Sequence, residues 1–331
     1  MTRRARAIVL VTLVAAGLSA ACSDSPSGPS RTAPPQAPSP PGATYTLSGR
    51  LVGTVTGEPI AGATVAVGSD TFVTDGDGAF TVTTAASNVR NLVISGDGLL
   101  TRETRLSVAT RDVTVDVIQD RAPFDLAFFR AFARNGLSPD AGLEPLRPLR
   151  NAPRIHIRTV DEAGQPIDSR TLDLVESVLR DSAAGWSAGR FPLEVIERGP
   201  GTRQGQSGWV TVIFPSAPEG DRCGRATVGT TTGFIELQYH DPLCTCGADE
   251  LIAPRTVRHE LGHVYGYWHT SGRRDVMYGD EWSERMCDQR PSSRELDHAK
   301  YMYARTPGNL DPDTDPSGTI LREPPVIVID D

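Results

Sequence analysis

The sequence is poor in cysteine and aromatic residues and has no excess of positive charge. Its 331 residues include five cysteines and 6% aromatic residues, and 33 Lys and Arg stand against 41 Asp and Glu, for a net charge of −8. Proteins that bind nucleic acid concentrate Lys and Arg on one face, so nucleic acid is not expected as the main partner. The length allows one large domain together with a small one.

The sequence also offers no apolar run of about 20 residues, the length that a permanent membrane span needs. The run from Ala7 to Ala21 is shorter and follows three arginines, which is typical of an export signal over residues 1–22. The small residues before Cys22 resemble a bacterial lipobox, and cleavage near Ala21 without lipid is the alternative. We expect lipid on Cys22 to anchor the protein in the bacterial cell envelope, as its only membrane contact; otherwise the protein is secreted.

The four remaining cysteines form an even set in a chain that is expected to be exported. This predicts two disulfides, and the tight C-x-C loop disfavours a bond between its own two members, leaving two pairings open. A cysteine metal site is the alternative, but the spacing matches known zinc sites poorly. The four residues are Cys223, Cys244, Cys246 and Cys287.

The first folded segment is expected after a linker. Residues 23–43 are mostly Ser, Pro, Gly and Ala, so they are expected to be a disordered tether. Residues 44–119 contain short strand-like runs separated by turn residues, which predicts a small all-β sandwich. The stretch from Ser48 to Val82 resembles the carboxypeptidase regulatory-like domain, a transthyretin-like sandwich.

The rest of the chain is expected to alternate strands and helices. Residues 120–150 form a connector with a helix over 124–134, and whether it is a packing helix or a pro-segment stays open. Residues 151–305 are typical of an α/β domain, whose last helix starts at a capping box at Ser292 and carries an exposed His298. Residues 306–331 are rich in Pro and Asp and are expected to be a disordered tail, although three aspartates there are spaced like calcium ligands.

One segment carries metal chemistry. His259 and His263 are four residues apart, so a helix would direct both imidazoles at one ion. Glu260 lies one residue further round the helix, where it can accept a proton from a metal-bound water. Gly266 is expected to end the helix in a left-handed conformation and bring His269 to the third ligand position. Three neutral imidazoles leave a fourth position open, as a catalytic zinc needs.

This motif and the Asp-Val-Met-Tyr segment that follows resemble the metzincin peptidases. The resemblance implies that Met277 forms an apolar floor beneath the metal, and that Tyr278 packs as in matrixin-like members. Gly279 stands where some members carry a zinc-reaching Tyr. The expected fold is multidomain: the sandwich, then an α/β (α+β) catalytic domain with a mixed twisted sheet and a zinc-binding helix. The resemblance also implies an extended peptide bound along an edge strand, for which residues 229–239 are the candidate.

The function predicted from these residues is a monomeric, zinc-dependent endopeptidase that cleaves polypeptides, with Glu260 as general base. The alternative is a non-catalytic surface lipoprotein that binds glycan or protein through the sandwich and holds a structural zinc. A structural zinc normally has four protein ligands, and no fourth ligand is evident beside the three histidines, which favours the enzyme. Zinc hydrolysis of a non-peptide amide is a third reading.

Overall fold

The computed structural model describes residues 44–85, 89–107, 112–137, 142–217, 222–239, 242–246, 251–279, 287–317 and 326–330. They all fall in one compact unit, Ala43–Asp331. The predicted export signal, Cys22 and the linker to residue 43 lie outside the described residues. Among the described residues, no helix is both long and apolar enough to span a bilayer.

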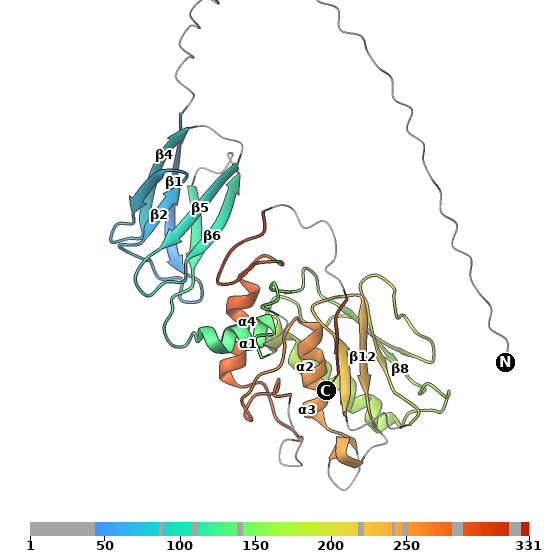
Figure 1. Cartoon of the computed structure of the whole chain (residues 1–331). Coiled ribbons are helices and arrows are strands. Elements are labelled where there is room, and N and C mark those ends of the chain that lie inside the picture. Colours follow the sequence, from blue (N-terminus) through green and yellow to red (C-terminus); the bar gives the residue numbers. More distant parts are fainter. Residues whose placement is uncertain are drawn as a thin grey trace, which may run out of the picture. The chain divides into compact units, whose positions relative to one another are not determined.

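The first part of the fold consists of two sheets around a shared apolar core (Figure 1). Alternating side chains point inward, as in β7, where Val113, Val115 and Val117 are buried and Asp112 and Thr114 are exposed. A two-sheet arrangement was predicted here. One sheet has the order β4-β1-β7, from β4 (Ala79–Ala85), β1 (Thr44–Gly53) and β7 (Asp112–Val117). The other has the order β3-β2-β5-β6, from β3 (Asp70–Val73), β2 (Thr64–Val67), β5 (Val89–Ser95) and β6 (Arg102–Ser107).

The second part contains a mixed six-stranded sheet in the order β15-β11-β12-β10-β8-β9. The four strands β12, β10, β8 and β9 run parallel, whereas β11 is antiparallel to both of its neighbours. The strands are β8 (Arg154–Arg158), β9 (Ile196–Gly199), β10 (Trp209–Ile213), β11 (Gly224–Thr227), β12 (Gly233–Leu237) and β15 (Val328–Asp330). The candidate edge at residues 229–239 is therefore wrong, because β12 lies between β10 and β11.

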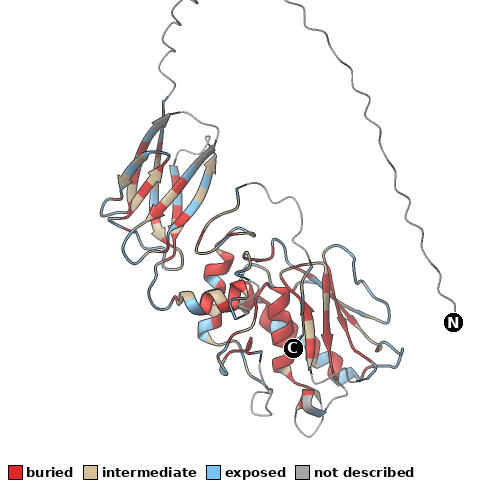
Figure 2. Ribbon diagram, in the orientation of Figure 1, coloured by how far each residue is buried: buried red, intermediate tan, exposed pale blue. Residues whose placement is uncertain are grey.

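Four helices accompany this sheet: α1 (Leu126–Arg134), α2 (Ser169–Trp186), α3 (Pro254–Val264) and α4 (Ser293–Tyr303). The predicted capping box at Ser292 is present, with Glu295 as its partner. Helix α3 packs against α2, β11 and β12, and every residue from Arg255 to Val264 is buried (Figure 2). A helix buried on all sides places its polar side chains inside the protein, where each must be accommodated.

Two disulfides fasten the chain around the start of α3. They join Cys223 to Cys244 and Cys246 to Cys287, one of the two pairings that the sequence left open. Cys246 belongs to the short hairpin of β13 (Thr245–Cys246) and β14 (Leu251–Ile252), and Cys244 directly precedes it. The Cys287 carbonyl accepts a hydrogen bond from the Arg255 amide (2.9 Å), so the second bridge also satisfies a backbone donor in the first turn of α3.

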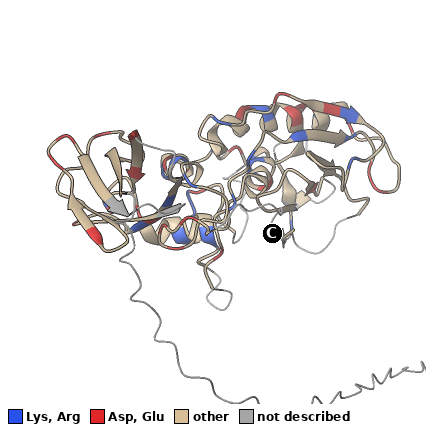
Figure 3. Cartoon of the chain, turned by 90° about the horizontal axis from the view of Figure 1, so that it is seen from above, with Lys and Arg blue, Asp and Glu red and all other residues tan. Residues whose placement is uncertain are grey.

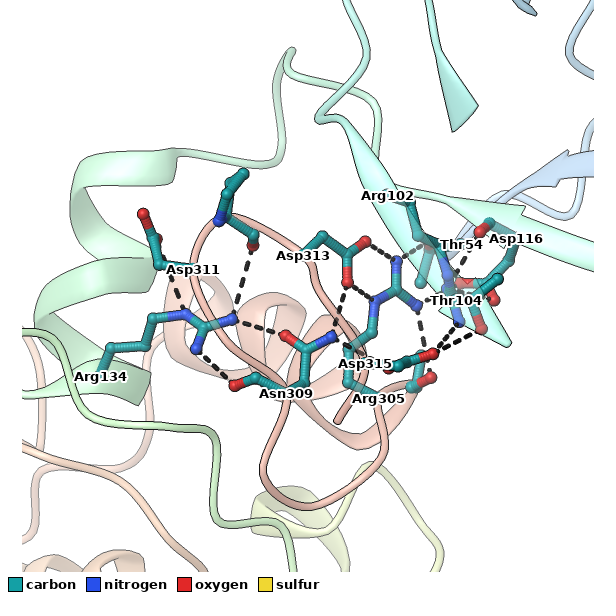
Figure 4. A network of polar contacts seen from close by, with 12 residues as sticks. Thr54, Arg102, Thr104, Asp116, Arg134, Arg305, Asn309, Asp311, Asp313 and Asp315 are labelled. Carbon is teal, nitrogen blue, oxygen red and sulfur yellow. Dashed lines mark hydrogen bonds and ion pairs between the residues drawn. The ribbon is translucent and has the colours of Figure 1, made fainter. Parts of the chain in front are cut away.

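The prediction of a disordered tail is wrong for residues 306–317, where Asn309 and Asp313 are fully buried. Arg305 binds Asp313 through both Nε (2.6 Å) and Nη2 (2.7 Å), and its Nη1 also reaches Asp116 of β7 (Figure 4). Burial by itself would raise the pKa of Asp116, but Arg305 and Arg102 lower it below its ordinary value of 3.8.

The three aspartates with calcium-like spacing are held by arginines. Arg130 binds Asp311 (2.8 Å), Arg305 binds Asp313, and Arg102 of β6 reaches Asp315 (3.3 Å). Leu100 and Ile118 from the first part also belong to the main core of the second part. Arg102 and Asp116 come from the two-sheet part and Arg305 from the end of α4, so this network joins the two parts.

His298 on α4 is also fully buried, so the expectation that it is exposed is wrong. Its ring stacks on Phe124 at 5.5 Å between centroids and meets Phe128 edge-on at 4.7 Å. Its Nε2 accepts from the Asp125 amide (3.0 Å), next to the start of α1. His298 thus ties α4 to α1.

Replacing Asp313 by Ala should destabilise the protein by about 3–5 kcal/mol, because it leaves the buried Arg305 side chain without the buried carboxylate that binds it through two hydrogen bonds. Urea unfolding of the purified protein measures the loss. Asp297→Ala, which breaks an exposed pair with Lys300, is the control and should cost less than about 1 kcal/mol. Equal losses in the two variants would contradict the role given to Asp313.

Candidate metal centre

The first two predicted ligands project from one side of α3. Pro254 opens this helix at a position where its missing N–H costs no hydrogen bond. His259 and His263 follow one turn apart, and their Nε2 atoms lie 3.1 Å from each other. Two nitrogens bound to one tetrahedral zinc at 2.0–2.1 Å are separated by about 3.3 Å. The helix therefore holds both imidazoles at nearly the spacing that a shared ion requires.

Backbone carbonyls fix which ring nitrogen faces the ion. His259 Nδ1 lies 2.6 Å from the Val276 oxygen, and His263 Nδ1 lies 2.8 Å from the Tyr267 oxygen. A carbonyl oxygen can only accept, so each Nδ1 donates a proton to its carbonyl and each Nε2 is left to face a shared ion. Both rings are thus oriented to bind a metal through Nε2.

The third ligand arrives through the turn that was predicted at Gly266. Helix α3 ends at Val264, and Gly266 has a φ of +101°, a conformation that favours glycine. A Cβ at this position would also lie 2.7 Å from Met302 Cε. The chain then returns, and one ring nitrogen from each of His259, His263 and His269 lies within 4.8 Å of the others. The structure brings the three predicted ligands together.

Glu260 lies against the backbone of β11. Its side chain is 1% exposed, and a Cβ built on Gly224 would stand only 2.7 Å from the Glu260 carboxyl carbon. Only glycine leaves room for the carboxyl group at this point of the sheet. Sequence reasoning missed Gly224, since nothing in the residues around it indicates which strand would pass beside the helix.

Met277 is fully buried, and its sulfur lies against Gly262 of α3. A side chain at Gly262 would overlap its sulfur, so the glycine between the two motif histidines admits the methionine. The turn itself is held by Glu295 of α4, whose carboxylate accepts from the amides of Met277 (2.9 Å) and Val276 (3.1 Å). Burial raises the pKa of Glu295 to about 7, while these amides act to lower it. This second role of the capping residue was not predicted.

The two residues after Met277 pack closely on the site. Tyr278 is buried, and its carbonyl accepts a hydrogen bond from Arg255 Nη2 (2.6 Å). The α-carbon of Gly279 lies beside His269, because a Cβ there would come within 2.6 Å of ring atoms Cγ and Nδ1. The sequence suggested only that a tyrosine is missing at position 279. The structure shows that no side chain fits there without moving the third imidazole.

No family model and no curated protein matches this chain. Among solved structures, metalloproteinase-II from Bacteroides fragilis is similar over 78% of this chain and 91% of its own, at 10% identity and a TM-score of 0.33. Two interface mutants of a type II cohesin–X-dockerin complex from Acetivibrio cellulolyticus match 22% of this chain, at 32% identity and a TM-score of 0.17. This chain spans about half (51%) of that matched chain.

Replacing Gly279 by Ala should weaken metal binding about tenfold while the fold is kept, because the added methyl group displaces His269. Competition with a chromophoric chelator measures the affinity for zinc or cobalt. Gly201→Ala is the matched control, since a Cβ there meets no atom within 4 Å. Unchanged affinity in Gly279→Ala would contradict the packing described for the third ligand.

Proposed function

We propose that the protein is a zinc-dependent endopeptidase. The observation that carries the proposal is the convergence of three histidine nitrogens beside a buried glutamate on the same helix. Nitrogen ligands in this number suit zinc, and a catalytic zinc keeps a position open for water or substrate. The cluster found among the described residues contains three ligands and no fourth.

In the proposed reaction, the three histidines would hold the zinc, and Glu260 transfers the proton. When bound, zinc would polarise the scissile carbonyl and make a water molecule more acidic. Glu260 accepts a proton from the attacking water, whose oxygen bonds to the carbonyl carbon. It then delivers that proton to the leaving nitrogen as the C–N bond breaks. Gly224 and the surrounding core hold the carboxylate in place and keep bulk water away from it.

The alternative function is a surface protein that binds glycan or protein and keeps a structural zinc. Two features favour the enzyme instead: the three-ligand cluster and the buried Glu260 carboxyl group beside it on the same helix. The two disulfides fit an exported protein. The proposal also includes three further points: the protein acts as a monomer, it cleaves polypeptides, and it carries lipid on Cys22.

The Glu260→Ala variant of the protein lacking residues 1–43 should keep one bound zinc and lose casein cleavage by about a thousandfold, because only the proton carrier is removed. Metal analysis and casein hydrolysis measure the two properties. His263→Ala should lose both, and Glu197→Ala, which alters an exposed pair with Arg203, should lose neither. Casein cleavage by Glu260→Ala at the unaltered rate would remove Glu260 from the mechanism.

A further inference from the structure

The strand that ends the six-stranded sheet comes from the last residues of the chain. Strand β15 pairs antiparallel with β11, with Val328 opposite Thr227 and Ile329 opposite Ala226. The Val228 amide donates to the Ile327 carbonyl (2.9 Å), so alternation of the ladder makes Ala226 and Ile329 the next hydrogen-bonded pair. Without residues 326–330, β11 would be the edge of this sheet.

Both ends of β11 meet the helix that carries the site. At its start, Gly224 lies against the carboxyl group of Glu260. Just beyond its end, the Gly229 amide donates to the His263 carbonyl (2.9 Å). Because β15 is antiparallel to β11, it runs towards Gly224, and its carboxyl end points at the catalytic glutamate. A peptide in this position would be directed at the metal centre.

The contacts of β15 are those that an unrelated extended peptide could also make. The strand has three residues, and its side chains are only partly covered: Val328 is 42% exposed and the preceding Val326 is 62% exposed. The central strand β10, by contrast, is buried along its whole length. Backbone hydrogen bonds to a sheet edge provide affinity for any extended peptide, whatever its sequence.

We propose that residues 327–330 occupy β11 as a displaceable competitor, within the same chain, of the extended peptide substrate that the resemblance leads us to expect along an edge strand. This inference rests on the proposed peptidase function. The substrate residues that precede the scissile bond would take the place and the direction of β15. A competitor on the same chain is present at high effective concentration, so it raises the substrate concentration needed for half-maximal rate.

The test compares the full chain with a chain that ends at Pro325 and with the Ile329→Pro variant, which removes an amide donor from the ladder. If β15 is docked about nine-tenths of the time, both changes should lower the KM for casein about tenfold and leave kcat unchanged. Val326→Pro is the matched control, because this residue precedes the strand and is exposed, and its KM should stay as in the full chain. A synthetic peptide of residues 326–331 should restore competitive inhibition of the shortened chain.

An unchanged KM in both altered chains would overturn the proposal, and so would unfolding of both, since β15 would then be a permanent strand. A second readout needs no catalysis. In the Glu260→Ala background, a fluorescent peptide of residues 326–331 should bind the shortened chain and not the full chain, and the β11 amides should exchange faster after shortening. If no variant cleaves casein, the peptidase function is wrong, but the binding and exchange measurements still test whether the C-terminal strand occupies β11. If the peptide does not bind the shortened chain and the β11 amides exchange at the same rate in both chains, the C-terminal strand does not occupy β11 as a displaceable competitor.

Discussion

The candidate metal centre depends on the hydrogen bond between His259 and the carbonyl of Val276. That bond orients one imidazole and requires the turn at Val276 and Met277 to lie directly beneath α3. The carboxylate of Glu295, at the start of α4, holds this turn by accepting hydrogen bonds from the amides of Val276 and Met277. The orientation of His259 therefore depends on three segments, namely α3, the turn and the first turn of α4, which are joined by hydrogen bonds to backbone groups of the turn. Such support is what keeps a metal site oriented before the ion binds.

Glycine occurs at three points where another group approaches α3 or the third histidine closely. Gly262 admits the sulfur of Met277, Gly224 admits the carboxyl group of Glu260, and Gly279 admits the ring of His269. In each case a single added carbon would fall inside the neighbouring group. Strand β11 and the turn at Met277 thus approach α3 closely, and Gly279 approaches the ring of His269 closely. These approaches contribute to the burial of a helix that carries two histidines and a glutamate.

The sequence was sufficient for the parts of the site that follow from local spacing. The positions of His259, His263 and His269, the turn at Gly266 and the capping box at Ser292 all depend on residues a few places apart, and helix geometry determines them. Strand order does not follow from local spacing, so the sequence predicts an edge at residues 229–239 and gives no sign that β15 pairs with β11. The Pro- and Asp-rich composition after residue 305 suggested disorder, because the arginines that bind its aspartates lie far away in the chain. His298 was placed in solvent for the same reason, since its aromatic neighbours belong to another segment.

The arginine network has a consequence for how such a protein is inherited. Arg305 is shared between Asp313, beside it in sequence, and Asp116 of the two-sheet part, and the core also takes in Leu100 and Ile118 from that part. An accessory domain joined only by a flexible linker can be exchanged between enzymes by recombination without loss of stability. Here an exchange would leave the buried guanidinium of Arg305 without Asp116 and would expose apolar core surface to water. The two parts should accordingly descend together as a matched pair, with their joining residues changing in concert.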